Sequence, residues 1–194
     1  MKKLIGSNKF KTAVFISGNG SNLKSLIRFS YLKKSPINIK IVISSNIKAK
    51  GLKIAKRFKI KTKIFSFDKN IKNENDVIHF LIRNKITFIC LAGFMKILSK
   101  NFLNKFKGKI LNIHPSLLPK YKGLNTHQRA INNNEKYSGC TVHLVNSKLD
   151  SGKIILQKKI RISNNETAKS LTEKILKQEH TLYPKAIKKL FSNR

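Results

Sequence analysis

Acidic side chains are scarce in this sequence. Its 194 residues include eight Asp and Glu against 42 Lys and Arg, which gives a formal net charge of +34. The basic residues are mostly Lys and are spread from Lys2 to Lys189, and Ile and Asn are also abundant. Since Lys, Ile and Asn share A/T-rich codons, a mutational bias accounts for the charge without a nucleic-acid partner. The charge should still favour anionic small molecules, and each remaining acid is a candidate for a specific role.

Cysteines and long apolar runs are also scarce. Cys90 and Cys140 are isolated within apolar or β-branched runs, which predicts buried free thiols in a reducing compartment. The absence of a C-x-x-C pair or a His/Cys cluster argues against a metal site. The first residues have no continuous apolar signal core, and no run approaches membrane-spanning length. We therefore expect a cytoplasmic protein that binds neither a metal nor a membrane.

Linkers and internal repeats are absent too, so the length predicts one domain over residues 1–194. Short β-branched runs alternate with helical stretches, which predicts an α/β fold with a largely parallel sheet. The expected strands cover 12–17, 38–44, 62–66, 86–91 and 109–113, followed by an antiparallel pair at 139–145 and 153–162. The expected helices cover 21–33, 50–58, 74–84, 96–105 and 126–133. A last helix should begin near Asn164–Asn165 and be kinked or restarted by Pro184.

The first predicted strand ends in a glycine-rich turn, "VFISGNGSNLKSLI". Gly18 and Gly20 permit a tight turn, and Ser21 and Asn22 offer donors at a helix N-terminus, which attracts anions. A dinucleotide site would need a small residue where Leu23 stands and an acid after the second strand, and neither is present. The turn therefore predicts a phosphate monoester site, although glycines can also serve only to close a turn.

Polar residues end the fifth predicted strand, in "LNIHPSLLPKYKG". Asn112 and His114 are two residues apart, so their side chains should share a face at the carboxyl edge where ligands gather. An Asn amide can donate to an oxyanion, and a His can carry a proton near neutral pH. Asp150, in a later turn, can orient His114 or hold a water. Each of these residues also has an ordinary structural interpretation, since Asn and Asp are common in turns.

Other histidines and one apolar segment are weaker candidates. His79 and His180 are expected on helix surfaces or in packing, His143 lies in a predicted strand, and His127 is a candidate only through its neighbourhood. The segment "AGFMKIL", residues 92–98, fits either the core or the wall of a flat hydrophobic ligand pocket.

Five segments together resemble the phosphoribosylglycinamide formyltransferase branch of the folate-dependent formyltransferase family. They are, in order, "ISGNGSNL", "LAGFMKIL", "LNIHPSLLPKYKG", "LDSG" and "QEHTLYP". The resemblance spans residues 11–190 and implies a Rossmann-like formyltransferase fold, with a mostly parallel twisted sheet, a late antiparallel strand pair and helices on both faces. It implies a phosphate-binding part at about 11–105 and a folate and catalytic part at about 106–190.

The resemblance also implies an activity and its residues. A formyl group would pass from 10-formyltetrahydrofolate to the amine of glycinamide ribonucleotide, in purine biosynthesis, without a metal. Its site residues would be Gly20, Ser21 and Asn22 for the phosphate, Glu179 for the glycinamide, Met95, Lys96, Ile97, Leu98 and Asn112 for the folate, and Asn112, His114 and Asp150 for catalysis. Both partners are then small molecules, and the chain would be a monomer or weak homodimer.

The chain departs from the family pattern at a few positions. Lys96 stands where the family typically has Arg, and Lys122 and Asn125 replace residues that are commonly Pro and His. An arginine expected in the loop around Lys69–Asn75 is absent, and a lysine there would substitute. Two rival functions stay open, namely transfer to another amine such as an amino sugar nucleotide, and RNA binding through the positive charge.

Overall fold

The computed structural model describes residues 9–67 and 71–192. Its seven strands form one sheet in the order β3-β2-β1-β4-β5-β6-β7. The strands are β1 (Phe10–Ile16), β2 (Ile37–Ser44), β3 (Lys61–Ile64), β4 (Phe88–Leu91), β5 (Lys109–His114), β6 (Tyr137–Leu144) and β7 (Ile154–Arg161). The helices are α1 (Ser21–Tyr31), α2 (Gly51–Arg57), α3 (Ile71–Arg83), α4 (Lys100–Lys105), α5 (Thr126–Asn132) and α6 (Ala168–Phe191).

The first five strands pair in parallel, and β5–β6 and β6–β7 pair antiparallel. This confirms the predicted α/β fold with a late antiparallel pair. β1 lies between β2 and β4, so the chain order reverses there. In a doubly wound sheet, ligands bind beyond the carboxyl ends of the strands at such a reversal.

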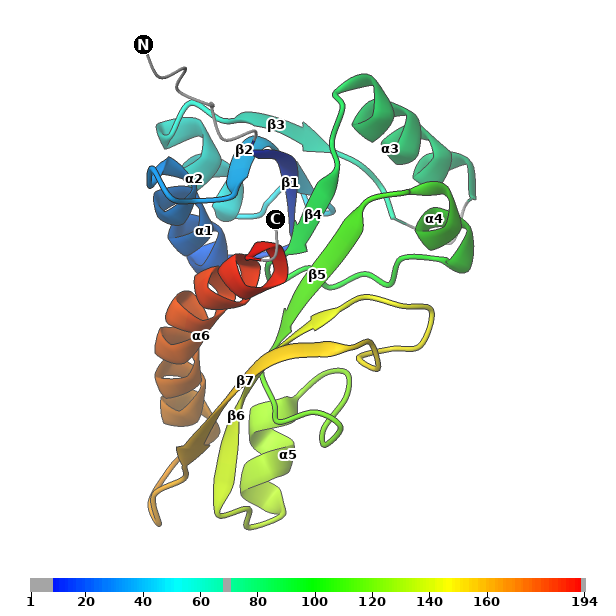
Figure 1. Ribbon diagram of the computed structural model, residues 1–194. Coiled ribbons are helices and arrows are strands. Elements are labelled where there is room, and N and C mark those ends of the chain that lie inside the picture. Colours follow the sequence, from blue (N-terminus) through cyan, green and yellow to red (C-terminus); the bar gives the residue numbers. More distant parts are fainter. Residues whose placement is uncertain (1–8, 68–70, 193–194) are drawn as a thin grey trace.

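Helices cover both faces of the sheet, because the central strands are apolar on both sides. Val14 and Ile16 of β1 pack in one core cluster with α1, α2 and α6, whereas Ala13 and Phe15 pack in a second cluster with α3 and α4. Figure 1 shows α1, α2 and α6 on one side of the sheet and α3 and α4 on the other. Cys90 and Cys140 are buried free thiols, as predicted. Burial raises the pKa of the Cys140 thiol to about 12, which keeps it in the unreactive thiol form.

Two expected helix starts were wrong. The helix predicted over 96–105 begins at Lys100, because the Ser99 hydroxyl accepts a hydrogen bond from the Phe102 N–H and caps it there. The last helix is capped by Thr167, in a reciprocal pair with Ser170, and not by the asparagines at 164–165. Of the two outcomes predicted at Pro184, a kink or a restart, the helix does not restart: it continues through Pro184, and its axis changes direction between its orange and red parts in Figure 1.

None of the helices in the described part of the chain is long and apolar enough to cross a membrane.

Candidate active site

A pocket of about 660 Å³ lies at the carboxyl ends of β1, β4 and β5. Residues from the turn after β1, the loop after β4, the end of β5, the loop around Leu149 and the inner face of α6 line it. Both halves of the sequence, about 11–105 and 106–190, therefore contribute to one pocket. This is where the chain order of the sheet reverses.

The N-terminus of α1 forms one wall. Gly20 precedes the helix with φ +77°, and a Cβ there would stand 2.6 Å from the Gly51 Cα, so the turn requires glycine at this position. No side chain in the described part of the chain caps the helix, so the first backbone N–H groups of α1 remain for a ligand. Gly20, Ser21 and Asn22 all line the pocket, as the phosphate hypothesis requires.

Asn22 and Glu179 meet in this wall although they are 157 positions apart. The Asn22 amide donates to Glu179 Oε2 at 2.6 Å, and both residues are buried. Asn22 Oδ1 is buried without a hydrogen-bond partner among the described residues. Burial raises the pKa of Glu179 to about 7, although the hydrogen bond from Asn22 opposes the rise. A cationic or amine-bearing ligand in the pocket would compensate this buried carboxyl.

The raised pKa predicts a pH-dependent stability that Glu179→Gln should abolish. Folding favours the proton on Glu179, so its contribution is full below the ordinary pKa near 4.5 and is lost as the pH rises through about 7. The loss amounts to roughly 3 kcal/mol. We expect urea unfolding to show the variant gaining roughly 3 kcal/mol of stability relative to the wild-type protein between pH 4 and pH 8. A Glu173→Gln variant, changed at an exposed position of the same helix, should not show this difference.

Asn112 and His114 on β5 both line the pocket, as their spacing predicted, and Asp150 lines it too. His114 is 6% exposed. Its Nδ1 lies 3.4 Å from Asp150 Oδ2, and the same oxygen accepts the Gly123 N–H at 2.9 Å. Asp150 has φ +45°, in the left-handed region, within the turn that precedes β7.

The protonation of His114 follows from its other contact. His114 Nε2 lies 2.9 Å from the Tyr121 carbonyl, and since a carbonyl only accepts, Nε2 carries a hydrogen. The titrating position is therefore Nδ1, on the Asp150 side. Burial lowers the pKa of His114, and the Tyr121 carbonyl and Asp150 oppose this without reversing it. Burial thus outweighs the opposing effect of the Asp150 charge on this pKa.

Asp150 is held in its charged form. Burial alone would raise its pKa, but His143, the Gly123 N–H and the charge of His114 together lower it below the ordinary value. A carboxylate thus faces the titrating nitrogen of His114, which is the arrangement that favours a transient imidazolium.

His143 is the site residue that the sequence patterns did not reveal. Its Nδ1 lies 2.9 Å from the Leu144 carbonyl, and its Nε2 lies 3.2 Å from the Asn112 amide nitrogen. This contact orients the amide and leaves its second N–H for a ligand. The same Nε2 lies 3.6 Å from Asp150 Oδ1. No local sequence pattern reveals the contact between His143 and Asn112, because it depends on the antiparallel register that sets the two residues opposite each other.

The loop after β4 supplies the apolar wall. Met95 and Ile97 line the pocket and are 67% and 72% exposed, and Lys96 lines it between them. Leu124 and Leu149 add exposed apolar surface from the opposite loops. Leu98, also expected at this wall, is not there. It is 6% exposed and packs in the second core cluster, so the wall ends at Ile97.

The structure shows where the residues that depart from the family pattern lie and what they contact. Lys122 Nζ donates to the Ser151 hydroxyl at 2.6 Å and so links two loops of the pocket. Asn125 has φ +57° at the start of α5, a conformation that Asn tolerates. His127 lines the pocket with its Nδ1 buried and without a hydrogen-bond partner in the described structure. Lys69 lies outside the described residues.

Comparison with known proteins decides the family. The model of the formyl transferase family matches residues 10–187. The chain belongs to the formyl transferase family. It is 42% identical to the phosphoribosylglycinamide formyltransferase of Haemophilus influenzae, over 92% of this chain and 85% of that protein. The crystal structure of phosphoribosylglycinamide formyltransferase from Brucella melitensis superposes with a TM-score of 0.88 at 40% identity, covering 94% of this chain and 96% of that one.

The chain also matches a small part of a much longer relative. The trifunctional purine biosynthetic protein adenosine-3 of Chironomus tentans is 40% identical over 97% of this chain, which spans 14% of that protein. The resemblance inferred from the five sequence segments is confirmed by all three comparisons.

Proposed function

We propose that the protein transfers a formyl group from 10-formyltetrahydrofolate to the primary amine of glycinamide ribonucleotide, giving formylglycinamide ribonucleotide for purine biosynthesis. The observation that carries the proposal is one pocket that joins an anion-binding helix N-terminus to Asn112, His114 and Asp150. The relatives named phosphoribosylglycinamide formyltransferase support this choice of substrates.

The two substrates would occupy different walls. The ribonucleotide phosphate binds at the N-terminus of α1, with Gly20, Ser21 and Asn22, and Glu179 receives the glycinamide. Because a nearby amine favours the charged carboxylate, binding lowers the raised pKa of Glu179. The folate lies against Met95, Lys96 and Ile97, whose exposed apolar surface suits a flat ring system.

The chemistry needs an oxyanion stabiliser and a proton path. The amine attacks the formyl carbon, and the carbonyl oxygen becomes a tetrahedral oxyanion. The Asn112 amide, oriented by His143, and the Nδ1–H of protonated His114 donate to it. A water held by Asp150 carries a proton from the attacking amine to the folate nitrogen, the bond from carbon to that nitrogen breaks, and the formyl carbonyl re-forms. Every bond and proton in the reaction is accounted for without a covalent enzyme intermediate.

The test is purified protein with both substrates, followed by the absorbance of the deformylated folate. We expect turnover that requires glycinamide ribonucleotide. If the protein turned over with an amino sugar nucleotide and not with glycinamide ribonucleotide, the proposed acceptor would be wrong but formyl transfer would stand. Strongly salt-dependent RNA affinity that survives loss of Asn112 and His114, with no formyl transfer, would overturn the proposal.

A further inference from the structure

The loop between β5 and α5 carries a residue under backbone strain next to His114. Tyr121 has φ +56°, a left-handed conformation that is uncommon for a bulky residue. Its carbonyl is the one that holds His114 Nε2, at 2.9 Å. Two residues further on, the Gly123 N–H holds Asp150 Oδ2. A single short segment therefore places both members of the His114–Asp150 pair.

The Tyr121 hydroxyl is anchored away from the pocket. It donates to Glu135 Oε1 at 2.8 Å and accepts from the Asn133 amide at 2.9 Å. Lys120 Nζ donates to the same Glu135 oxygen at 2.7 Å. The hydrogen bond from Lys120, and after it the one from Tyr121, lower the pKa of Glu135. The group that anchors the Tyr121 hydroxyl is therefore a carboxylate at neutral pH.

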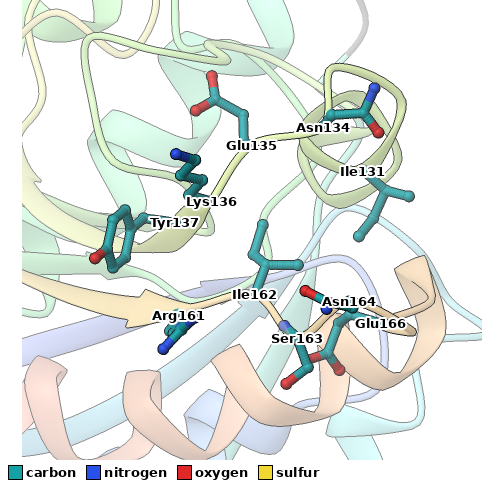
Figure 2. A pocket seen from close by; sticks show the side chains of 10 residues that line it. All are labelled: Ile131, Asn134, Glu135, Lys136, Tyr137, Arg161, Ile162, Ser163, Asn164 and Glu166. Atoms are coloured by element: carbon teal, nitrogen blue, oxygen red, sulfur yellow. The ribbon is translucent and has the colours of Figure 1, made fainter.

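Glu135 itself belongs to a second pocket, of about 590 Å³, lined also by Arg161 and Asn164. Figure 2 shows the Glu135 carboxylate directed away from Asn164 and Glu166 of that pocket. Glu135 does not line the first pocket among the described residues, and it contacts the loop beside that pocket through the hydrogen bonds from Lys120 and Tyr121.

The Tyr121 ring is held separately. The Arg129 guanidinium lies 5.1 Å from the ring centroid, and its Nη1 donates to the Lys122 carbonyl at 2.7 Å and the Leu124 carbonyl at 3.4 Å. Contacts on three sides thus hold a backbone conformation that the residue would not adopt unaided.

We propose that Tyr121 and Glu135 are positioning residues for His114, in that the Glu135–Tyr121 hydrogen bond fixes the strained backbone whose carbonyl orients the imidazole toward Asp150. The proposal deepens the proposed function and rests on it for its kinetic consequence. Neither residue lines the pocket of the active site among the residues found there, so each acts through the backbone of the loop.

The groups around His114 determine the direction in which its pKa would change if Tyr121 moved. The charged and titratable groups that face His114 are Asp150, His143 on β6, and Arg129 and His127 on α5. Of the contacts that act on His114, the Tyr121 carbonyl and Asp150 raise its pKa, while His143 and Arg129 lower it. Loosening the Tyr121 carbonyl lowers the pKa further, so protonated His114 is lost at a lower pH.

The experiment compares Tyr121→Phe with the wild-type protein. The substitution keeps the ring over Arg129 and removes the two hydroxyl hydrogen bonds. We expect kcat to fall about tenfold, since small displacements of catalytic groups are costly, with KM for both substrates within about twofold. The alkaline limb of the kcat profile should move to lower pH, and Glu135→Ala should do the same. Tyr31→Phe is the matched control, because its hydroxyl bonds the Phe58 carbonyl on the surface at α1 and α2.

An NMR titration of the His114 imidazole supplies a readout that does not depend on activity. A lower titration midpoint of His114 in Tyr121→Phe, with no such change in Tyr31→Phe, supports the proposal. It does so even if the wild-type protein transfers no formyl group, because the absence of formyl transfer would contradict only the proposed function. An unchanged midpoint and an unchanged kcat profile overturn the proposal. A lower melting temperature with an unchanged midpoint also overturns it, because it would assign Tyr121 a purely structural role.

Discussion

Replacing His114 with alanine should lower kcat by about 10²–10⁴-fold while KM for both substrates changes little. The imidazole supplies the Nδ1 proton beside Asp150, and a positioned proton carrier or oxyanion donor is worth factors of this size. KM should hold, because the phosphate site at α1 and the apolar wall at Met95 are separate from this side chain. Steady-state kinetics of formyl transfer, with each substrate varied in turn, measure both quantities.

His79→Ala is the matched control for that variant. His79 is exposed on α3 and does not line the pocket, so its loss should leave kcat unchanged. If His114→Ala turned over at close to the wild-type rate with an intact fold, the assignment of His114 as a donor to the oxyanion would be wrong.

Replacing Asp150 with asparagine should lower kcat by about 10²–10⁴-fold and change its pH profile. The carboxylate raises the pKa of His114 against the effect of burial, so its neutralisation lowers that pKa. Protonated His114 is then lost at a lower pH, and the alkaline limb of kcat should move in the acid direction. The asparagine keeps the size of the side chain and an oxygen acceptor for the Gly123 N–H, so folding should be preserved.

The control for Asp150→Asn is Asp76→Asn, the same change at an exposed position on α3. It removes the same charge from a strongly basic chain without touching the pocket, and it should leave the pH profile unchanged. An identical profile for both variants would remove Asp150 from the proton path.

The scarcity of acids in the sequence proved informative. Glu74, Asp150 and Glu179 all have buried or nearly buried carboxyl groups. Glu74 accepts the Ser99 N–H at 3.0 Å at the start of α4, Asp150 faces His114, and Glu179 meets Asn22. These three acids have defined partners at interior positions, where a lysine would be an unpaired buried cation.

Helix and strand positions were largely predictable, because they depend on local patterns. β-branched runs and the 3.6-residue periodicity predicted all seven strands and six helices within a few residues. The errors at 96–99 and 164–165 occurred where side-chain caps decide, since Ser99 and Thr167 each accept a particular backbone N–H. Such a bond depends on the backbone geometry at one residue, which periodicity does not specify.

By itself, the sequence predicted the α/β fold, with Asn112 and His114 on one face at the carboxyl edge of the sheet, and its motifs indicated the family. The fold and this placement were predictable because a two-residue spacing fixes the face of a strand and because the carboxyl ends of parallel strands meet at one edge. Only the tertiary structure decided which partners orient these side chains. His143 reaches Asn112 through strand register, Tyr121 offers its carbonyl through a strained loop, and Leu98 leaves the pocket for the core. These contacts join residues distant in the chain or depend on one backbone angle, so no local pattern encodes them.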